Sequence, residues 1–147
     1  MSLFLGGTSS ANECHDYEEG SFTMSLSQGS NTSNSGRYVK IGTIVLAAGN
    51  VSLDNISSGS TVQINGLPFT SDGGGVGRSY NGSIRGYNCS NISGSGMRPT
   101  NAVIHGDGTN VQFGTFESAQ AWSMMAYNDF TSTNNSIRWT CVYKSND

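Results

Sequence analysis

Stretches of alternating apolar and polar side chains constrain the fold of this chain more than any other feature of its sequence. SFTMSLS at 21–27 and SIRWTCVYK at 136–144 both alternate strictly. Successive side chains of a β-strand point to opposite faces of a sheet, so each stretch places its large apolar side chains on one face and mainly hydroxyl or charged side chains on the other. The aromatic face of 136–144 indicates a strand that lies in the core of a sheet.

Further strands are expected between turn-forming stretches rich in Gly, Asn and Ser. Gly42 divides the most apolar part of the chain, RYVKIGTIVLAAGNVSL at 37–53, into the two strands of a hairpin. The stretch SAQAWSMMAYNDF at 118–130 is the exception, because its Ala and Met residues favour one or two helical turns. Short strands at close spacing predict an all-β fold with antiparallel strands, a sandwich or a barrel. The other expected strands lie at 60–66, 83–93, 101–106 and 110–116.

Core-forming residues are scarce in this chain. Leu, Ile, Val and Phe together make up about a fifth of the residues, a level at which disorder is common. Disordered chains of this kind normally carry a large net charge. This chain of 147 residues has a net charge of only −3, and 12% of its residues are charged. We therefore expect one folded domain, stabilised by many short strands and by burial of surface against copies of itself.

The balance of charge argues against nucleic acid as a partner. Seven Lys and Arg stand against ten Asp and Glu, with no basic run to neutralise phosphates. The opening MSLFLGG lacks the positive charge and apolar length of a signal peptide, and no window approaches a membrane span. Cys14, Cys89 and Cys141 are odd in number and lack CxxC spacing, so neither a disulfide framework nor a zinc site is expected. These features predict a soluble protein that folds in a reducing cytosol without membrane insertion.

The cluster CHDYEE at 14–19 has the residue types of a metal site or an acid–base site. Neighbouring side chains of an extended segment point to opposite sides, so Cys14 and His15 do not readily share an ion. Glu18 and Glu19 lie in a polar segment without the burial that separates the pKa values of a general acid and a general base. We expect a structural junction instead, in which carboxylates form salt bridges or accept backbone N–H bonds. The residues of this junction are Asp16, Tyr17, Glu18, Glu19 and Gly20.

Three motifs in the first half of the chain resemble, in order and spacing, those of a known protein family. ANECHDYEEGSFTMSL at 11–26 is similar to the pattern A-N-x-L-D-D-Y-E-E-G-[TS]-[WF]-T-P. GRYVKIG at 36–42 and INGLPF at 64–69 are similar to a Y-x-K-I-G hairpin and a G-L-P-F turn. On these motifs the chain resembles the C-terminal domain of many tailed-bacteriophage fibre and tail proteins. The closing WTCVYK resembles the last strand of that family, whereas the match between residues 72 and 136 is weak.

The resemblance implies an antiparallel, jelly-roll-like β-sandwich that assembles as a homotrimer. Residues 1–20 would form an extended N-terminal lead-in that attaches to other virion proteins, and residues 21–147 would form the sandwich. The protein would be assembled in the host cytoplasm, reside on the virion and serve in adhesion to the host. The chain departs from the family pattern at Cys14 and His15, where Leu-Asp is usual, and at Met24, where Pro is frequent.

No motif indicates catalysis. The sequence offers no nucleophile elbow in a strand–turn–helix context, no defensible His–Asp spacing and no carboxylate pair suited to glycoside cleavage. We therefore expect a protein without enzymatic activity, metal or cofactor that binds host surface glycans without cleaving them. The alternative is a structural capsid or tail decoration or spike protein with no dedicated receptor site.

The turn-rich middle and late regions hold the residues best suited to contact a glycan. Sugar-binding sites stack flat rings on sugar faces and use Asn, Asp and Arg for directional hydrogen bonds. Each aromatic residue here also suits packing in the core or in a trimer interface. The candidate ligand-binding residues are Tyr80, Arg85, Tyr87, Arg98, His105, Trp122 and Tyr127.

Overall fold

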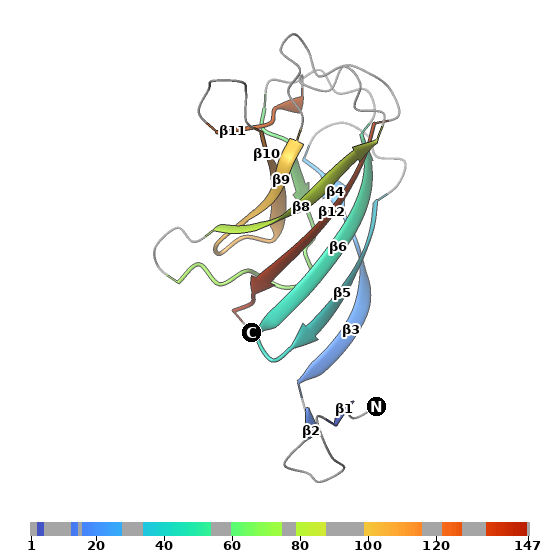
Figure 1. The fold of residues 1–147 in the computed structure, drawn as a ribbon, viewed down its shortest axis with the longest axis vertical. Helices are drawn as coiled ribbons and strands as arrows, with labels where there is room; N and C mark the ends of the chain where they lie inside the picture. Colours follow the sequence, from blue (N-terminus) through green and yellow to red (C-terminus); the bar gives the residue numbers. More distant parts are fainter. Residues whose placement is uncertain are drawn as a thin grey trace.

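The computed structural model describes residues 3–4, 13–14, 16–27, 34–53, 60–74, 79–87, 99–115, 122–127 and 135–146. These residues form strands, turns and loops without an α-helix (Figure 1). The strands are β1 (Leu3–Phe4), β2 (Glu13–Cys14), β3 (Tyr17–Thr23), β4 (Ser25–Leu26), β5 (Asn34–Ile41), β6 (Ile44–Leu53), β7 (Gln63–Asn65), β8 (Ser79–Tyr87), β9 (Pro99–His105), β10 (Asn110–Thr115), β11 (Ser123–Met124) and β12 (Asn135–Lys144).

One antiparallel sheet contains all of these strands except β1 and β2, which pair with each other. Its strand order is β3-β5-β6-β12-β8-β9-β10-β7-β4, and β11 pairs with β10. Only Met24 separates β3 from β4, so the two ends of this order belong to one run of chain. The sheet is therefore nearly closed into a barrel. The prediction of an all-β, antiparallel fold is confirmed.

Two segments turn the corners between the halves of this sheet. The first part of β8, at 79–82, pairs with β9, whereas its second part, at 83–87, pairs with β12. On the other side, β3 pairs with β5 and β4 pairs with β7. A strand that changes partners along its length is the usual way to turn a corner between sheets. Figure 1 shows β3, β5, β6, β12 and β8 side by side as one curved layer.

The alternating stretch near the C-terminus forms β12, which lies between β6 and β8 in the middle of the sheet. The side chains at the even positions 138–144 are exposed. Four inward side chains are at most 2% exposed: Ile137, Trp139, Cys141 and Tyr143. The alternation at 21–27 is confirmed too, because Met24 is buried while its two outward neighbours are exposed. The period-two pattern therefore predicted both strands and the faces that they bury.

The predicted hairpin is formed by β5 and β6, which a two-residue turn of Gly42 and Thr43 connects. Gly42 has a φ of +57°, in the left-handed region that glycine adopts without steric cost. A glycine at the first position of a two-residue turn matches the twist of the flanking strands.

The few apolar residues of the chain are concentrated inside the nearly closed sheet. Both halves of the sheet contribute to a single buried cluster. Its largest fully buried side chains include Tyr127, Tyr143, Phe113, Met24 and Leu53.

Residues 122–126 of the stretch 118–130, where helical turns were expected, are extended, and Tyr127 lies in a 3₁₀ turn. Met125 donates its backbone N–H to the carbonyl of Phe113 at 2.8 Å, and Val62 donates its N–H to the carbonyl of Met125 at 2.8 Å. Pairing on both sides holds the backbone extended and buries Met125 completely. This tertiary burial outweighs the weak helix propensity of Ala and Met.

The sheet begins earlier in the chain than the sequence suggested. β3 starts at Tyr17, so it crosses the expected boundary between the lead-in at 1–20 and the sandwich at 21–147. The first residues of β3 pair with the end of β5 next to the hairpin turn. Part of the expected lead-in is therefore an integral strand of the sheet.

Candidate functional site

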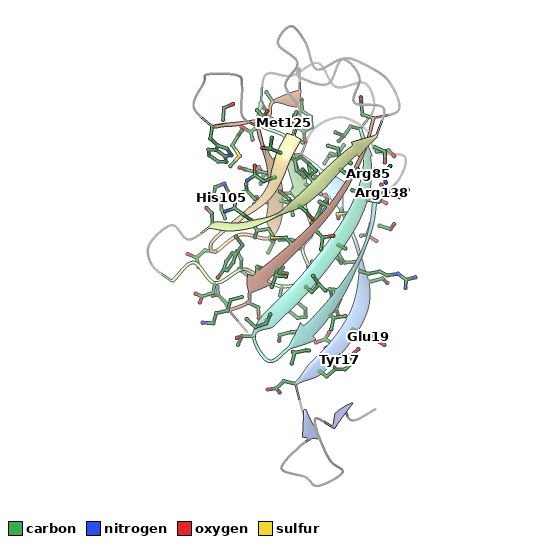
Figure 2. The ribbon with its side chains drawn as sticks, viewed as in Figure 1. Tyr17, Glu19, Arg85, His105, Met125 and Arg138 are labelled. Carbon is green, nitrogen blue, oxygen red and sulfur yellow. The ribbon has the colours of Figure 1, made fainter. Side chains whose placement is uncertain are left out.

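The glutamates of the predicted junction hold tyrosine hydroxyls at the start of the sheet. Tyr17 donates its hydroxyl proton to Glu19 at 2.8 Å, and Tyr38 donates its hydroxyl proton to Glu18. These hydrogen bonds raise the pKa of both tyrosines, and desolvation and the glutamate charge act in the same direction. Figure 2 shows Tyr17 and Glu19 together near the beginning of β3.

Two other junction residues fix the backbone of β3. The carbonyl of Asp16 accepts the N–H of Gly42 at 3.0 Å, which ties the start of β3 to the hairpin turn. A Cβ atom at Gly20 would lie 2.8 Å from the ring of Tyr38, so a larger residue there would displace that ring. The described contacts of the junction are therefore structural.

Two of the candidate tyrosines belong to the packed interior. Tyr127 is completely buried, and its hydroxyl lies 3.0 Å from the hydroxyl of Ser27. Tyr80 is half-buried; it donates its hydroxyl proton to the carbonyl of Asp72 at 3.0 Å and packs its ring against Tyr143. The structure thus places Tyr127 where no surface ligand reaches it, and Tyr80 where its hydroxyl already holds a loop.

His105, at the end of β9, has both ring nitrogens engaged by neighbouring side chains. Its Nδ1 lies 3.1 Å from the hydroxyl of Ser79, and its Nε2 lies 3.2 Å from Oε1 of Gln112. The HGDGTN stretch at 105–110 forms the turn that connects β9 to β10. His105 thus serves to link the neighbouring strands β8, β9 and β10.

Trp122 is the candidate aromatic residue that the structure places at the surface. Its indole is 41% exposed and lies against Gly114, where a side chain would collide with it. Its Nε1 donates to Oδ1 of Asn101 at 3.4 Å, and Asn101 donates its amide N–H to Oδ1 of Asn81 at 3.0 Å. We call Trp122, Asn101 and Asn81 the amide–indole cluster.

Arg85 lies in a second surface feature, a shallow hollow on the outer face of β3, β5, β6, β12 and β8. The register places Arg85 opposite Arg138, and Figure 2 shows the two side by side on β8 and β12. Arg37 of β5 also lines the hollow. We call this feature, with a volume of about 660 Å³, the arginine hollow.

Small side chains form the floor of the arginine hollow. One row of the outer face crosses five strands in register, from Ser21 through Arg37, Ala48 and Thr140 to Ser83. Apart from Arg37, these side chains are short, so the long arginines stand at the rim of a depression. The hollow is therefore built from strand register and side-chain size.

Sequence reasoning missed Arg37 and Arg138 as site residues. The alternation of 136–144 placed Arg138 on the face opposite Trp139, which was the available signal. Pairing it with Arg85 requires the register between β12 and β8, which a single sequence does not reveal. Of the remaining candidates, Tyr87 ends β8 with its side chain outside the described part, and Arg98 lies outside the described residues.

Two further findings concern metal sites and membrane spans within the described residues. Among the described ranges, no three His, Cys, Asp or Glu side chains are grouped so that they could hold a metal ion. In the same part of the chain, no helix has the length and apolar character needed to cross a membrane.

Comparisons with protein-family models, with curated proteins and with solved structures found no match to this chain. The likeness to tailed-phage fibre and tail proteins therefore depends on the sequence motifs alone.

Proposed function

We propose that this protein is a bacteriophage virion protein, a fibre-like adhesin domain that binds host surface glycans without cleaving them. The sequence motifs supply the virion context. The observation that carries the glycan-binding proposal is the amide–indole cluster, an exposed ring hydrogen-bonded to one of two linked amides. An exposed indole offers a flat apolar surface for a sugar face, and amides donate and accept the hydrogen bonds that sugar hydroxyls need.

Contacts of the described carboxylates support binding without cleavage. Glu18 and Glu19 accept protons from tyrosine hydroxyls, and Asp72 pairs with Lys144 at 2.8 Å. Asp107 accepts the backbone N–H of Gly73 at 3.2 Å. Glycoside cleavage needs two carboxyl groups that flank a bound sugar, whereas these groups have structural partners.

The proposal includes the two-layered sandwich and the homotrimer that the resemblance implies. The layers would be β3-β5-β6-β12-β8 and β8-β9-β10-β7-β4, with β8 shared between them. Support for a trimer comes from an apolar strip of exposed side chains beside the hairpin turn. The strip consists of Ile41, Ile44, Leu46 and Val142, each 45–52% exposed. Three copies on one virion structure would strengthen weak individual sites by engaging a repetitive surface together.

Light scattering at micromolar concentration tests the trimer. We expect a mass of roughly three times 15.5 kDa. Val142→Asn should weaken the assembly, whereas Thr140→Asn, two residues earlier on the same face of β12, should leave it intact. A monomer for the unmodified protein would contradict the trimer.

The apolar strip also favours the second candidate function, a structural capsid or tail decoration protein. Such a protein would use the strip to pack on other virion proteins and would need no receptor site. Counting copies per virion by quantitative mass spectrometry separates the two: capsid-wide copy numbers favour decoration, and a few copies per tail favour adhesion.

Glycan binding is tested with purified protein on an array of bacterial surface polysaccharides. We expect Trp122→Ala to weaken binding at least tenfold, and Trp122→Phe, which keeps a flat ring, to weaken it less. Ser25→Ala changes an exposed residue outside the cluster, the apolar strip and the arginine hollow, and serves as the control, which should bind normally. Binding to neutral polysaccharides that survives Trp122→Ala unchanged, or release of free sugar, would contradict the proposal.

A further inference from the structure

We propose that the arginine hollow binds the carboxylate groups of an acidic polysaccharide, with Arg37, Arg85 and Arg138 as the residues that recognise the charge. This inference rests on the proposed glycan-binding function and specifies the chemical class of the glycan. The evidence for it is the composition and shape of the hollow, which shares no residue with the amide–indole cluster.

Positive charge is concentrated on the face of the sheet that forms the hollow. The chain has seven Lys and Arg and a net charge of −3. Three of the seven line this hollow, and its lining contains no Asp or Glu. A positively charged patch on a protein of negative net charge attracts anions over a short range, whereas the rest of the surface repels them.

Two of these arginines, Arg85 and Arg138, oppose each other in the sheet, and no described residue forms an ion pair with either. Arg138 and Arg85 are direct cross-strand partners, an arrangement that destabilises a sheet when the charges are alike. The ion pair found among the described residues is Lys144–Asp72, elsewhere on the sheet, and none involves the three arginines of the hollow. A bound carboxylate between Arg138 and Arg85 would turn this repulsion into two attractive contacts.

Strand register places the arginines within reach of one ligand. With about 4.8 Å between neighbouring strands and about 6.8 Å between alternate residues, the Cα atoms of Arg37 and Arg138 are about 12 Å apart on one face. Extended arginine side chains from these positions can converge on a ligand that lies across β6. A guanidinium group presents paired N–H donors that match a carboxylate, so each arginine can bind in a bidentate manner.

The floor of the hollow suits a sugar chain. Ser35, Ser83 and Thr140 present exposed hydroxyl groups along it, which can donate to and accept from sugar hydroxyls. A hollow of about 660 Å³ that is open to solvent along the sheet receives a segment of a polymer from the side. Acidic polysaccharide meets both requirements, the repeated carboxylates and the hydroxyl-rich backbone.

The experiment measures binding of the full chain to three polycarboxylate chains (alginate, hyaluronate and polysialic acid), with dextran as the neutral probe and dextran sulfate and single-stranded DNA as other polyanions. We expect binding to at least one polycarboxylate that weakens as salt rises from 50 to 300 mM. Arg138→Gln should weaken that binding roughly tenfold or more. Arg138→Lys keeps the charge but loses the paired donors, so its affinity should lie between those of Arg138→Gln and the unmodified protein.

Lys144→Gln is the matched control, because it removes one positive charge from the same face of β12 outside the hollow. It should change binding less than about twofold. Arg85→Gln is a second test of the hollow, should Arg138→Gln alter the fold as judged by circular dichroism. Equal losses for Lys144→Gln and Arg138→Gln would overturn the assignment of the hollow.

The other outcomes separate this inference from the proposed function. Binding to dextran or other neutral glycans alone, lost in Trp122→Ala and kept in Arg138→Gln, would overturn the acidic class and leave glycan binding in place. Tighter binding to DNA or dextran sulfate than to every polycarboxylate would overturn the carboxylate assignment. Binding to no glycan of any class would overturn both.

Discussion

Gly36 of β5 and Gly49 of β6 are cross-strand partners, and two aromatic rings occupy the space that their missing side chains leave. The ring of Phe22 lies over Gly36, the indole of Trp139 lies over Gly49, and the ring centroids are 6.4 Å apart. A Cβ atom at Gly49 would lie 2.7 Å from the indole nitrogen of Trp139. These glycines are therefore required by packing, since neither has a positive φ.

Replacing Gly36 by Ala should destabilise the protein by about 1–3 kcal/mol, because the added methyl group overlaps the ring of Phe22. Denaturant unfolding followed by tryptophan fluorescence measures this change. Ser35→Ala, the exposed neighbour, should change stability by less than about 0.5 kcal/mol. Equal stability of the two variants would show that the ring does not occupy this space.

Cys141 should be an unreactive thiol in the folded protein. It is 1% exposed, and burial raises its pKa to about 11. At pH 8 roughly one thiol in a thousand would be ionised, and the thiolate is the form that alkylating reagents attack. In a Cys14→Ser/Cys89→Ser background, iodoacetamide should label the protein only after unfolding. Labelling at the rate of an exposed thiol would contradict the burial of β12.

The raised pKa of Cys141 also predicts that the free energy of unfolding falls at alkaline pH. Its pKa is higher in the folded than in the unfolded state, so its contribution to stability is present below pH 9 and is lost as pH rises towards about 11. The raised pKa values of Tyr17 and Tyr38 act in the same direction, because their hydroxyl protons are held only while the glutamate hydrogen bonds persist.

At the scale of elements, Met24 closes the sheet. It separates β3 from β4 and is 1% exposed. Its backbone N–H donates to the backbone carbonyl of Asn34 at 2.9 Å, and its backbone carbonyl accepts from the side-chain amide of Asn34 at 2.8 Å. The chain passes here from pairing with β5 to pairing with β7. One buried side chain thus anchors the point where the two halves of the sheet meet.

Met24→Ala should cost about 2–5 kcal/mol of unfolding free energy, because it leaves a cavity at this corner. Met24→Leu nearly conserves volume and should cost less than about 1.5 kcal/mol. Thermal unfolding of both variants measures the difference. Similar losses for the two would mean that shape, rather than buried volume, matters at the corner.

The pairing of β8 with β12 places Arg85 opposite Arg138, and this pair predicts a gain in stability on mutation. Arg138→Gln should stabilise the protein by about 0.2–1 kcal/mol, because it removes a like-charge cross-strand pair. Lys144→Gln should have no stabilising effect, since Lys144 is paired with Asp72. Denaturant unfolding at low salt measures both, and a stability loss in Arg138→Gln would contradict the repulsion.

The sequence predicts those strands that bury one face in the core and expose the other face to solvent. The stretches that became β12, β3 with β4, and the β5–β6 hairpin carry this pattern. The helical turns expected at 118–130 are absent from residues 122–126, because the extended form of these residues depends on pairing with distant strands, which local propensity does not report. The amide–indole cluster was predicted only in part. Trp122 was a candidate, but its contact with Asn101 depends on the packing of its ring over Gly114, which the sequence does not reveal.

For the whole molecule, the nearly closed sheet explains how a chain with few apolar residues forms a core. The inward faces of its strands meet in a single buried cluster, and the outer face is left for other roles. Along β5, β6 and β12, that outer face is apolar beside the hairpin turn and carries arginines farther along the strands. Sequence spacing indicated the strands, but the order of the strands and the composition of this outer face depend on long-range register.

The central claim is that the outer sheet face binds glycans. The most direct measurement is the binding isotherm of the purified protein on a panel of acidic and neutral bacterial surface polysaccharides, compared with that of the double variant Trp122→Ala/Arg138→Gln. The account predicts saturable binding by the unmodified protein to at least one polysaccharide and its loss in the folded double variant. Undiminished binding by the double variant, or no binding to any polysaccharide, would contradict it.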